Sequence, residues 1–473
     1  MTAGPRSLLI FLALPIVVLL AGNARGQSDE PMRTASPGLT CSPAPCLLTP
    51  TQASEGGGLA TDTPIVTNPL NSKQLLLGSV DYNCSGEGSD VGFHLSGDGG
   101  STWERVECMP AIVTKQRDFQ PLDEPSVGYD RKGNAYIAGL YFDTEGDGGH
   151  GLVAVQKSTD GTHWSKPIVA LRLPGQTYPF ETSFAVDPNL ESPRANSLYI
   201  SGVMELAHGT QVLVSHSTDG GATWRQTAVD AVQKYPEEDD FTRMAVGEDG
   251  TVYAAWIHCR GKSGSGGALC PTVHIMFSKS TDGGNTWSPP QQVATVKMPQ
   301  YWLLPITYER VYNYPAIAVD DSNGPYSGNL YVAMYTWTGA YLRAQVIRST
   351  DGGETWSQPL PLAPKSDTHD QFFPAISVSS TGKVGVSWLD RRNDPNNIDY
   401  QAFAAISNDG GQSFGANWQL TTAFSNPETN GTENNWMGDY TGNTWAGDTF
   451  IAAWMDSSNG VDMQEVVGGI RLK

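Results

Sequence analysis

The sequence predicts an all-β protein in which one structural unit repeats within a single domain. Its 473 residues include 52 Gly and 31 Pro, which favour tight turns between short strands. Charged residues make up 16% of the chain, against about 25% in an average protein, so helices joined by ion pairs are disfavoured. A pattern of about eight residues also recurs six times, and self-similarity at a regular spacing indicates a repeated supersecondary unit.

The repeated pattern reads Ser-Thr-Asp-Gly-Gly-x-Thr-Trp in its most regular copies, and successive copies begin 58 to 69 residues apart. The Asp side chain can accept hydrogen bonds from backbone N–H groups of its own turn, and Gly supplies positive φ. The terminal Trp can wedge between neighbouring sheets. We therefore interpret the six acids as structural turn residues. They are Asp98, Asp160, Asp219, Asp282, Asp351 and Asp409.

This pattern resembles the Asp box, or bacterial neuraminidase repeat, of the sialidase-like proteins. The resemblance implies a β-propeller of four-stranded blades, with each box in the hairpin between the third and fourth strands. It also implies that the boxes lie on the face opposite the active site.

The number of blades follows from the strands around the boxes. Two β-rich strands precede each box, as in residues 373–378 and 384–390. A seventh pair follows the last box, at 439–442 and 450–456, and residues 465–472 end the chain. Residues 39–49 could supply the missing outer strand and so remove an exposed sheet edge. We predict seven blades closed by an N-terminal strand; six blades, as in known sialidases, is the alternative.

The N-terminus predicts export. Residues 8–20 form an apolar run of 13 residues after Arg6, and small residues follow it, which is typical of a signal peptide and too short for a membrane span of about 20 residues. We expect a signal peptide at 1–26, an N-terminal segment at 27–58 that is partly linker, and a propeller at 59–473. The mature protein is then secreted, extracellular or periplasmic, with no membrane span, and we expect a monomer.

Cysteine and charge content limit the function further. An even number of Cys in an exported chain favours disulfides. Six Cys allow 15 pairings, and proximity in sequence suggests Cys41–Cys46, Cys84–Cys108 and Cys259–Cys270. The formal net charge of -20 disfavours binding to nucleic acid, because the protein repels a phosphate backbone.

Strand direction predicts where chemistry could occur. In a propeller, the start of strand 1 and the end of strand 2 lie on one face, around the central channel. Carboxylates that share a channel raise one another's pKa and can act as general acids. The catalytic candidates at these places are Asp123, Glu124, Glu181, Asp240, Asp390, Asp439 and Tyr440. The substrate-binding candidates are Arg243, Arg260, Arg391, Arg392, Tyr178, Tyr312 and Trp436.

Other interpretations of these residues remain open. The acids could cap loop ends, and Arg391 and Arg392 could hold their loop through Asp–Arg pairs. Clustered carboxylates could also bind calcium, although no cofactor is required. In sialidases, an Arg triad binds the sialate carboxylate, a Tyr assisted by Glu is the nucleophile, and an Asp is the acid/base. The Arg-Ile-Pro of that family is absent, since Asp62-Thr63-Pro64-Ile65 stands at that position.

Three functions are compatible with the sequence. The first is a secreted glycosidase that acts on sialoglycans or other polysaccharide ends at the channel face. The second is a non-catalytic propeller that binds a carbohydrate or a cell-surface protein. The third is a structural module stabilised by a metal. A pair of channel carboxylates beside an aromatic shelf would favour the first.

Overall fold

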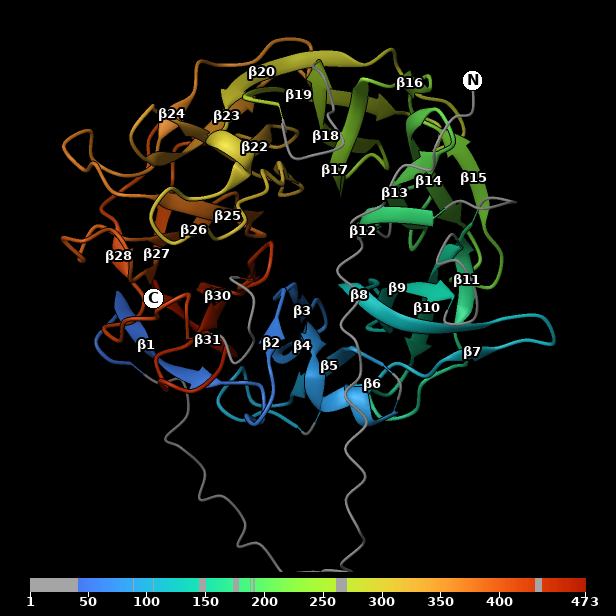
Figure 1. Cartoon of the computed structure of the whole chain (residues 1–473), viewed down its shortest axis with the longest axis horizontal. Helices are drawn as coiled ribbons and strands as arrows, with labels where there is room; N and C mark the ends of the chain where they lie inside the picture. The colour runs from blue at the N-terminus through green and yellow to red at the C-terminus, as the bar shows by residue number, and fades with distance from the viewer. Residues whose placement is uncertain are drawn as a thin grey trace, which may run out of the picture.

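The computed structural model is a seven-bladed β-propeller, in which seven sheets surround a central axis (Figure 1). It describes residues 41–473 apart from 88, 105, 144–149, 173–177, 188, 190–191, 261–269 and 430–435. The prediction of seven blades is confirmed, and the six-bladed alternative is wrong. The predicted signal peptide, residues 1–26, lies outside the described residues, as do residues 27–40 of the N-terminal segment.

The blades follow one another along the chain. Blade 1 contains β2 (Ala60–Thr61), β3 (Ile65–Asn68), β4 (Asn71–Asp81), β5 (Val91–Ser96) and β6 (Glu107–Cys108). Blade 2 contains β7 (Ile112–Val113), β8 (Asp118–Tyr129), β9 (Ala135–Asp143), β10 (Gly151–Ser158) and β11 (Ile168–Leu171). Blade 3 contains β12 (Tyr178–Val186), β13 (Leu198–Leu206), β14 (Gly209–Ser217), β15 (Arg225–Ala228) and β16 (Gln233–Lys234). Blade 4 contains β17 (Glu237–Val246), β18 (Val252–Arg260), β19 (Thr272–Ser280) and β20 (Gln291–Lys297).

The remaining blades have four strands each. Blade 5 contains β21 (Ala316–Val319), β22 (Leu330–Trp337), β23 (Leu342–Ser349) and β24 (Leu360–Pro361). Blade 6 contains β25 (Gln371–Val378), β26 (Val384–Asp390), β27 (Gln401–Ser407) and β28 (Trp418–Gln419). Blade 7 contains β29 (Gly442–Ala446), β30 (Thr449–Asp456), β31 (Gln464–Arg471) and β1 (Cys46–Gln52). The described residues contain two further elements, the 3₁₀ helices η1 (Tyr82–Glu87) and η2 (Gln300–Trp302).

Blade 7 is completed from the other end of the chain. Strand β1 pairs antiparallel with β31, from Cys46 opposite Arg471 to Gln52 opposite Val466, and the two strands lie side by side in Figure 1. Leu48 of β1 is buried with 2% of its surface exposed. The predicted closure by an N-terminal strand is therefore confirmed, and β31 has a partner on both sides.

The strand order defines two faces of the molecule. The first full strands of neighbouring blades pack against one another around the ring, so they are innermost. Because adjacent strands of a blade are antiparallel, the start of the first strand and the end of the second lie on one face, here the channel face. The hairpin between the third and fourth strands lies on the opposite face, here the box face.

Each octapeptide forms the hairpin turn between the third and fourth strands of blades 1 to 6. In blade 3, Asp219 accepts hydrogen bonds from the backbone N–H of Thr223 at 2.9 Å, the Thr223 hydroxyl at 2.6 Å and the Ser217 hydroxyl at 2.8 Å. The Trp164 ring of the second turn lies 4.5 Å from Phe93 of blade 1. The hydrogen bonds of Asp219 therefore stabilise the hairpin turn, and the contact between Trp164 and Phe93 packs one blade against the next.

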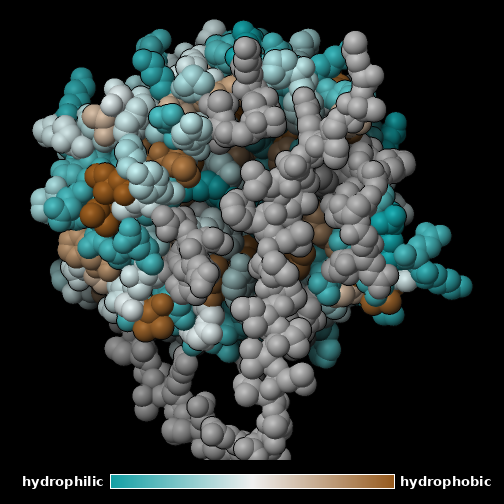
Figure 2. Space-filling view, viewed as in Figure 1, coloured by the Kyte–Doolittle hydropathy of each residue, from teal (hydrophilic) through white to brown (hydrophobic). Residues whose placement is uncertain are grey.

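Apolar side chains fill the spaces between blades. Trp256, Trp388 and Trp454, all on second strands, are 1–2% exposed. The described part of the surface in Figure 2 is mostly hydrophilic, with hydrophobic residues in separate spots. Disulfides join Cys41 to Cys46, Cys84 to Cys108 and Cys259 to Cys270, the pairs that proximity suggested. Within the described ranges, no helix has the length and apolar character needed to cross a bilayer.

The innermost strands share a feature that positions the site. Blades 2, 3, 4 and 6 have a register shift near the start of this strand, and blade 1 is broken there between β2 and β3. One residue in each of these five segments has positive φ although it is not Gly. These residues are Asp62, Glu124, Glu181, Phe241 and Phe373. A residue with positive φ at a bulge changes the direction in which its side chain points. In this protein these five residues lie beside the central axis.

Candidate functional site

Seven residues at equivalent positions form an inner ring around the channel. In each blade, this residue lies two positions before the innermost strand begins its uninterrupted pairing with the second strand, as Glu181 lies two positions before Ser183. Blades 1 to 3 contribute acids and blades 4 to 7 contribute aromatic residues. In blade order, the inner ring is Asp62, Glu124, Glu181, Phe241, Tyr314, Phe373 and Tyr440.

Two acids of the inner ring, Asp62 and Glu124, bind the backbone of a neighbouring blade. Asp62 Oδ1 accepts the N–H of Asp439 at 2.6 Å and that of Tyr440 at 3.3 Å. Glu124 accepts the N–H groups of Glu181, at 2.5 Å, and of Thr182. These bonds fix the blades relative to one another, and they bring Asp439 and Glu181 to the channel.

Further acids lie beside the ring. Asp123 precedes Glu124, and Asp240 precedes Phe241. Asp123 Oδ1 accepts the Glu124 N–H at 2.8 Å, and Asp240 Oδ1 accepts the Phe241 N–H at 3.1 Å. Asp123, Asp240 and Glu181 are partly exposed, whereas Asp62 and Glu124 are 1% and 7% exposed. The partly exposed acids are therefore the ones that a ligand can reach.

Burial and mutual repulsion raise the pKa values of these acids. Loss of solvation, followed by the nearby charges of other carboxylates, raises the pKa of Glu181 well above its ordinary value. Burial is also the main cause that raises the pKa of Asp123 to about 6 and of Glu124 to about 7. The pKa values of Asp62 and Asp240 are raised well above 3.8 for the same first reason. The channel face thus holds carboxyl groups that retain protons near neutral pH.

Arg310 introduces a positive charge to this face. Its Nε lies 3.0 Å from Asp439 Oδ1, and its terminal nitrogen bonds Asp439 Oδ2. The guanidinium lies 4.6 Å from the centre of the Tyr312 ring and 5.9 Å from that of Trp436. Trp436, Tyr312 and Asp439, all predicted from the sequence, therefore gather around an arginine that sequence reasoning did not select.

Arg243 lies deeper, between two tyrosine rings. Its guanidinium is 4.3 Å from the centre of the Tyr314 ring and 4.6 Å from that of Tyr440. Its NH1 donates to the carbonyls of Thr182 and Thr242, both at 3.0 Å. Below it, a channel cavity of about 180 Å³ is lined by Ile65, Val127 and other small or apolar residues. Arg243 and Tyr440 also line this cavity.

The tyrosines of the inner ring have different partners. The Tyr314 hydroxyl donates to Glu181 Oε2, whereas the Tyr440 hydroxyl donates to the Pro125 carbonyl at 2.9 Å. The sequence proposed Tyr440 as the reactive tyrosine. The tyrosine that faces a carboxyl group is Tyr314, so its position fits that role better.

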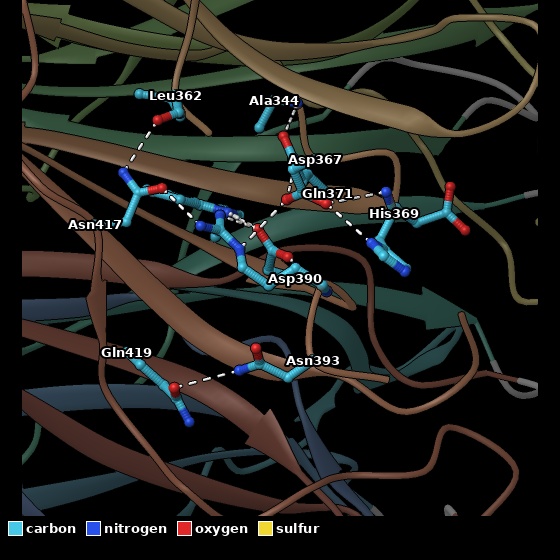
Figure 3. Close-up of polar contacts among 12 residues, drawn as sticks. Ala344, Leu362, Asp367, His369, Gln371, Asp390, Asn393, Asn417 and Gln419 are labelled. Carbon is cyan, nitrogen blue, oxygen red and sulfur yellow. Dashed lines mark hydrogen bonds and ion pairs between the residues drawn. The ribbon is translucent and has the colours of Figure 1, made fainter. Parts of the chain in front are cut away.

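The predicted residues at second-strand ends lie farther from the axis, because strands in a sheet are about 4.8 Å apart. Asp390 accepts the Trp388 indole N–H at 2.7 Å and bonds Arg392. Arg392 also donates to Asn417 of the outer edge of blade 6 at 2.8 Å. Figure 3 shows Asp390, Asn417 and Asp367 within this polar network. It is the Asp–Arg network that the sequence analysis left open as the alternative.

Arg391 and Arg260 do not join the inner ring. The Arg391 side chain is fully buried, 3.1 Å from Glu309 and 3.5 Å from Asp370. Arg260 is exposed and lines a separate cavity of about 360 Å³ with Asp239 and His258. Tyr178 begins β12, but its side chain lies outside what the structure describes. Of the predicted arginines, only Arg243 thus lies at the ring.

The residues missed had a signal in the sequence. Arg310 and Tyr314 alternate before β21 with Tyr312, which the sequence did select, so one side of an extended segment carries all three. Trp388 and Trp454 each stand two residues before an acid and donate to it, because residues i and i+2 share a face. That spacing marks Asp390 and Asp456 as partners of buried tryptophans. In the part of the chain that the structure describes, no three His, Cys, Asp or Glu residues are arranged to hold a metal.

Comparisons with known proteins support the fold. No family model matches the chain, and a search of curated proteins gave no match. Among solved structures, an ulvan lyase of polysaccharide lyase family PL25 matches at TM-score 0.50 with 12% identity, covering 87% of this chain and 95% of that one. An α-L-arabinofuranosidase from Fusarium graminearum (TM-score 0.48, 12% identity) covers 76% of this chain and 98% of its own.

A third example is the NanB sialidase from Streptococcus pneumoniae, at TM-score 0.45 and 11% identity, covering 78% of this chain and 70% of that one. At such identities the likeness shows the propeller fold alone. The chemistry of this chain therefore has to be argued from its own residues.

Proposed function

We propose that the protein is a glycoside hydrolase whose active site consists of Glu181 of the inner ring and the neighbouring acids Asp123 and Asp240. The observation that carries this proposal is the convergence of Asp123, Glu181 and Asp240 at the starts of three innermost strands, beside the aromatic groups of Tyr312 and Trp436. Two carboxyl groups with different proton affinities are the usual requirement for cleavage of a glycosidic bond. Aromatic rings can stack against the apolar face of a sugar.

The roles follow from the proton affinities. Glu181 is the candidate general acid, because burial and neighbouring carboxylates raise its pKa well above its ordinary value. The Tyr314 hydroxyl donates to its Oε2 and holds the carboxyl group in place. Asp123, with a pKa of about 6, is ionised at neutral pH and is the candidate general base for water. The ulvan lyase of similar fold acts on a polysaccharide, and from it we extend to this chain only the class of ligand, a carbohydrate.

The test is hydrolysis of fluorogenic aryl glycosides that cover arabinosides, xylosides, glucosides, galactosides and sialosides. We expect turnover by the wild type, and a loss of about 100-fold or more in kcat for Glu181→Gln and Asp123→Asn. Glu354→Gln is the matched control, because the Glu354 side chain is 71% exposed on the box face. It should retain the wild-type rate.

If the folded protein hydrolyses none of these glycosides, the hydrolase proposal is contradicted. That result would favour the non-catalytic alternative, in which the shelf of Arg310, Tyr312 and Trp436 binds a glycan without cleaving it. Glycan-array binding that is lost in Trp436→Ala would then support that function.

A further inference from the structure

We propose that Asp439 determines specificity by occupying Arg310, so that the channel face accepts sugar units without an acidic group. The inference rests on the proposed carbohydrate ligand and concerns the charge of that ligand. It separates this chain from an enzyme that acts on sialic acid, whose carboxylate requires free guanidinium groups.

The Arg310–Asp439 pair occupies one of the two edges through which a guanidinium binds a carboxylate. A guanidinium binds a carboxylate through two parallel N–H groups, and Asp439 already receives such a pair from Nε and a terminal nitrogen. Trp436 Nε1 lies 3.4 Å from Asp439 Oδ2 and adds a third contact. The Arg310 side chain is 38% exposed, so a ligand can touch it, but its positive charge is already paired with the Asp439 carboxylate.

Hydrogen bonds to the backbone fix the position of Asp439. Its own N–H is bound by Asp62 Oδ1 at 2.6 Å, and the next N–H, of Tyr440, is bound by the same oxygen at 3.3 Å. The Asp439 side chain is 11% exposed. Movement of Asp439 away from Arg310 would therefore disturb the contact between blades 7 and 1 and leave a carboxylate without its cation.

The guanidinium groups of Arg243 and Arg391 are also engaged. Arg243 is enclosed by Tyr314 and Tyr440 and donates to two carbonyls, and Arg391 is fully buried against Glu309. Beside the ring, Asp123 is ionised at neutral pH and would repel an anion. Among the described residues, the electrostatics of this face thus oppose an acidic sugar and suit hydroxyl groups, which can donate to carboxylates.

The experiment compares sugars that differ only in an acidic group. Aryl β-glucoside is paired with aryl β-glucuronide, and galactoside with galacturonide; a sialoside is added. We expect the wild type to favour the neutral member at least 10-fold in kcat/KM or, for free sugars, in Kd from calorimetry. Asp439→Asn preserves the shape and releases Arg310, and we expect it to move that ratio at least 10-fold toward the acidic sugar.

Two further variants make the result specific. Asp240→Asn removes one carboxyl group without unpairing Arg310, and it should move the ratio less than 3-fold. In the double variant Asp439→Asn with Arg310→Met, the gain for the acidic sugar should disappear. Thermal unfolding of each variant establishes that it is folded before the ratios are compared.

The outcomes separate this inference from the proposed function. A wild type that prefers the glucuronide or the sialoside overturns the inference while supporting a carbohydrate ligand. A folded Asp439→Asn variant with an unchanged ratio overturns it too. Failure of every sugar to bind or react overturns the proposed function and this inference together.

Discussion

At the scale of single residues, several members of the inner ring have positive φ, a backbone conformation that residues other than Gly rarely adopt. Asp62, Glu124 and Glu181 have φ values of 58°, 53° and 57°, and each such residue costs on the order of 1–3 kcal/mol. In all three blades the strained residue is an acid that bonds the next blade or Tyr314. The strain is thus concentrated where the candidate site lies, and it is compensated by contacts between blades.

Glu124 gives a pH dependence of stability with a defined sign. Burial raises its pKa from 4.5 to about 7, so between these values the folded protein keeps a proton that the unfolded chain releases. Stability from this group is therefore present below about pH 4.5 and is lost as pH rises toward 7. The shift corresponds to about 3 kcal/mol.

We therefore expect the unfolding free energy of the wild type to fall between pH 5 and pH 8, and Glu124→Gln to show a shallower fall. Urea unfolding at several pH values measures both. Glu354→Gln, with its carboxyl group on the surface, should follow the wild type. Parallel curves for the wild type and Glu124→Gln would show that Glu124 does not titrate in this range.

At the scale of elements, the box turns use their acids for structure. Hydrogen bonds from the Thr223 hydroxyl and N–H, and from Ser217, lower the pKa of Asp219 to about 2. The turn is exposed, so water weakens the stabilisation that these bonds supply. Because the boxes lie on the face opposite the inner ring, we expect a change in a box to affect stability without affecting the site.

Asp219→Asn tests this role. Its stabilisation is present above the ordinary pKa of about 3.8 and is lost as pH falls toward 2. We expect the variant to melt about 1–3 °C below the wild type at pH 7, with the gap narrowing between pH 4 and pH 2 and with ligand binding unchanged. Calorimetry at these pH values measures the gap. A loss of binding in a variant of normal melting temperature would contradict the structural role.

At the scale of the whole molecule, the sequence was sufficient to predict the architecture. Six octapeptides set the spacing of the hairpins, and the strand pair after the last of them indicated a seventh blade. The pairing of β1 with β31 followed from the need to cover a sheet edge. These signals are local and repeated, so each supports the others.

The site was predicted only in part, for geometric reasons. The innermost strands converge at the axis, and the structure has Glu181 in the inner ring with Asp123 and Asp240 beside it. Ends of second strands lie one strand farther out, and Arg392 bonds Asp390 and Asn417 there. Arg310 was missed because it lies in the connection between β20 and β21, where its only strand-like pairing is an isolated bridge with Leu303.

The central claim is that a sugar binds at the starts of the innermost strands of blades 1 to 4. The most direct measurement is a crystal structure of the protein with the best sugar of the panel bound. We predict a sugar within about 2.6–3.2 Å of the carboxyl groups of Asp123 or Glu181, stacked beside Tyr312 or Trp436. A sugar seated instead on the Asp390–Arg392 network or on the box face, with the inner ring free, would contradict the account.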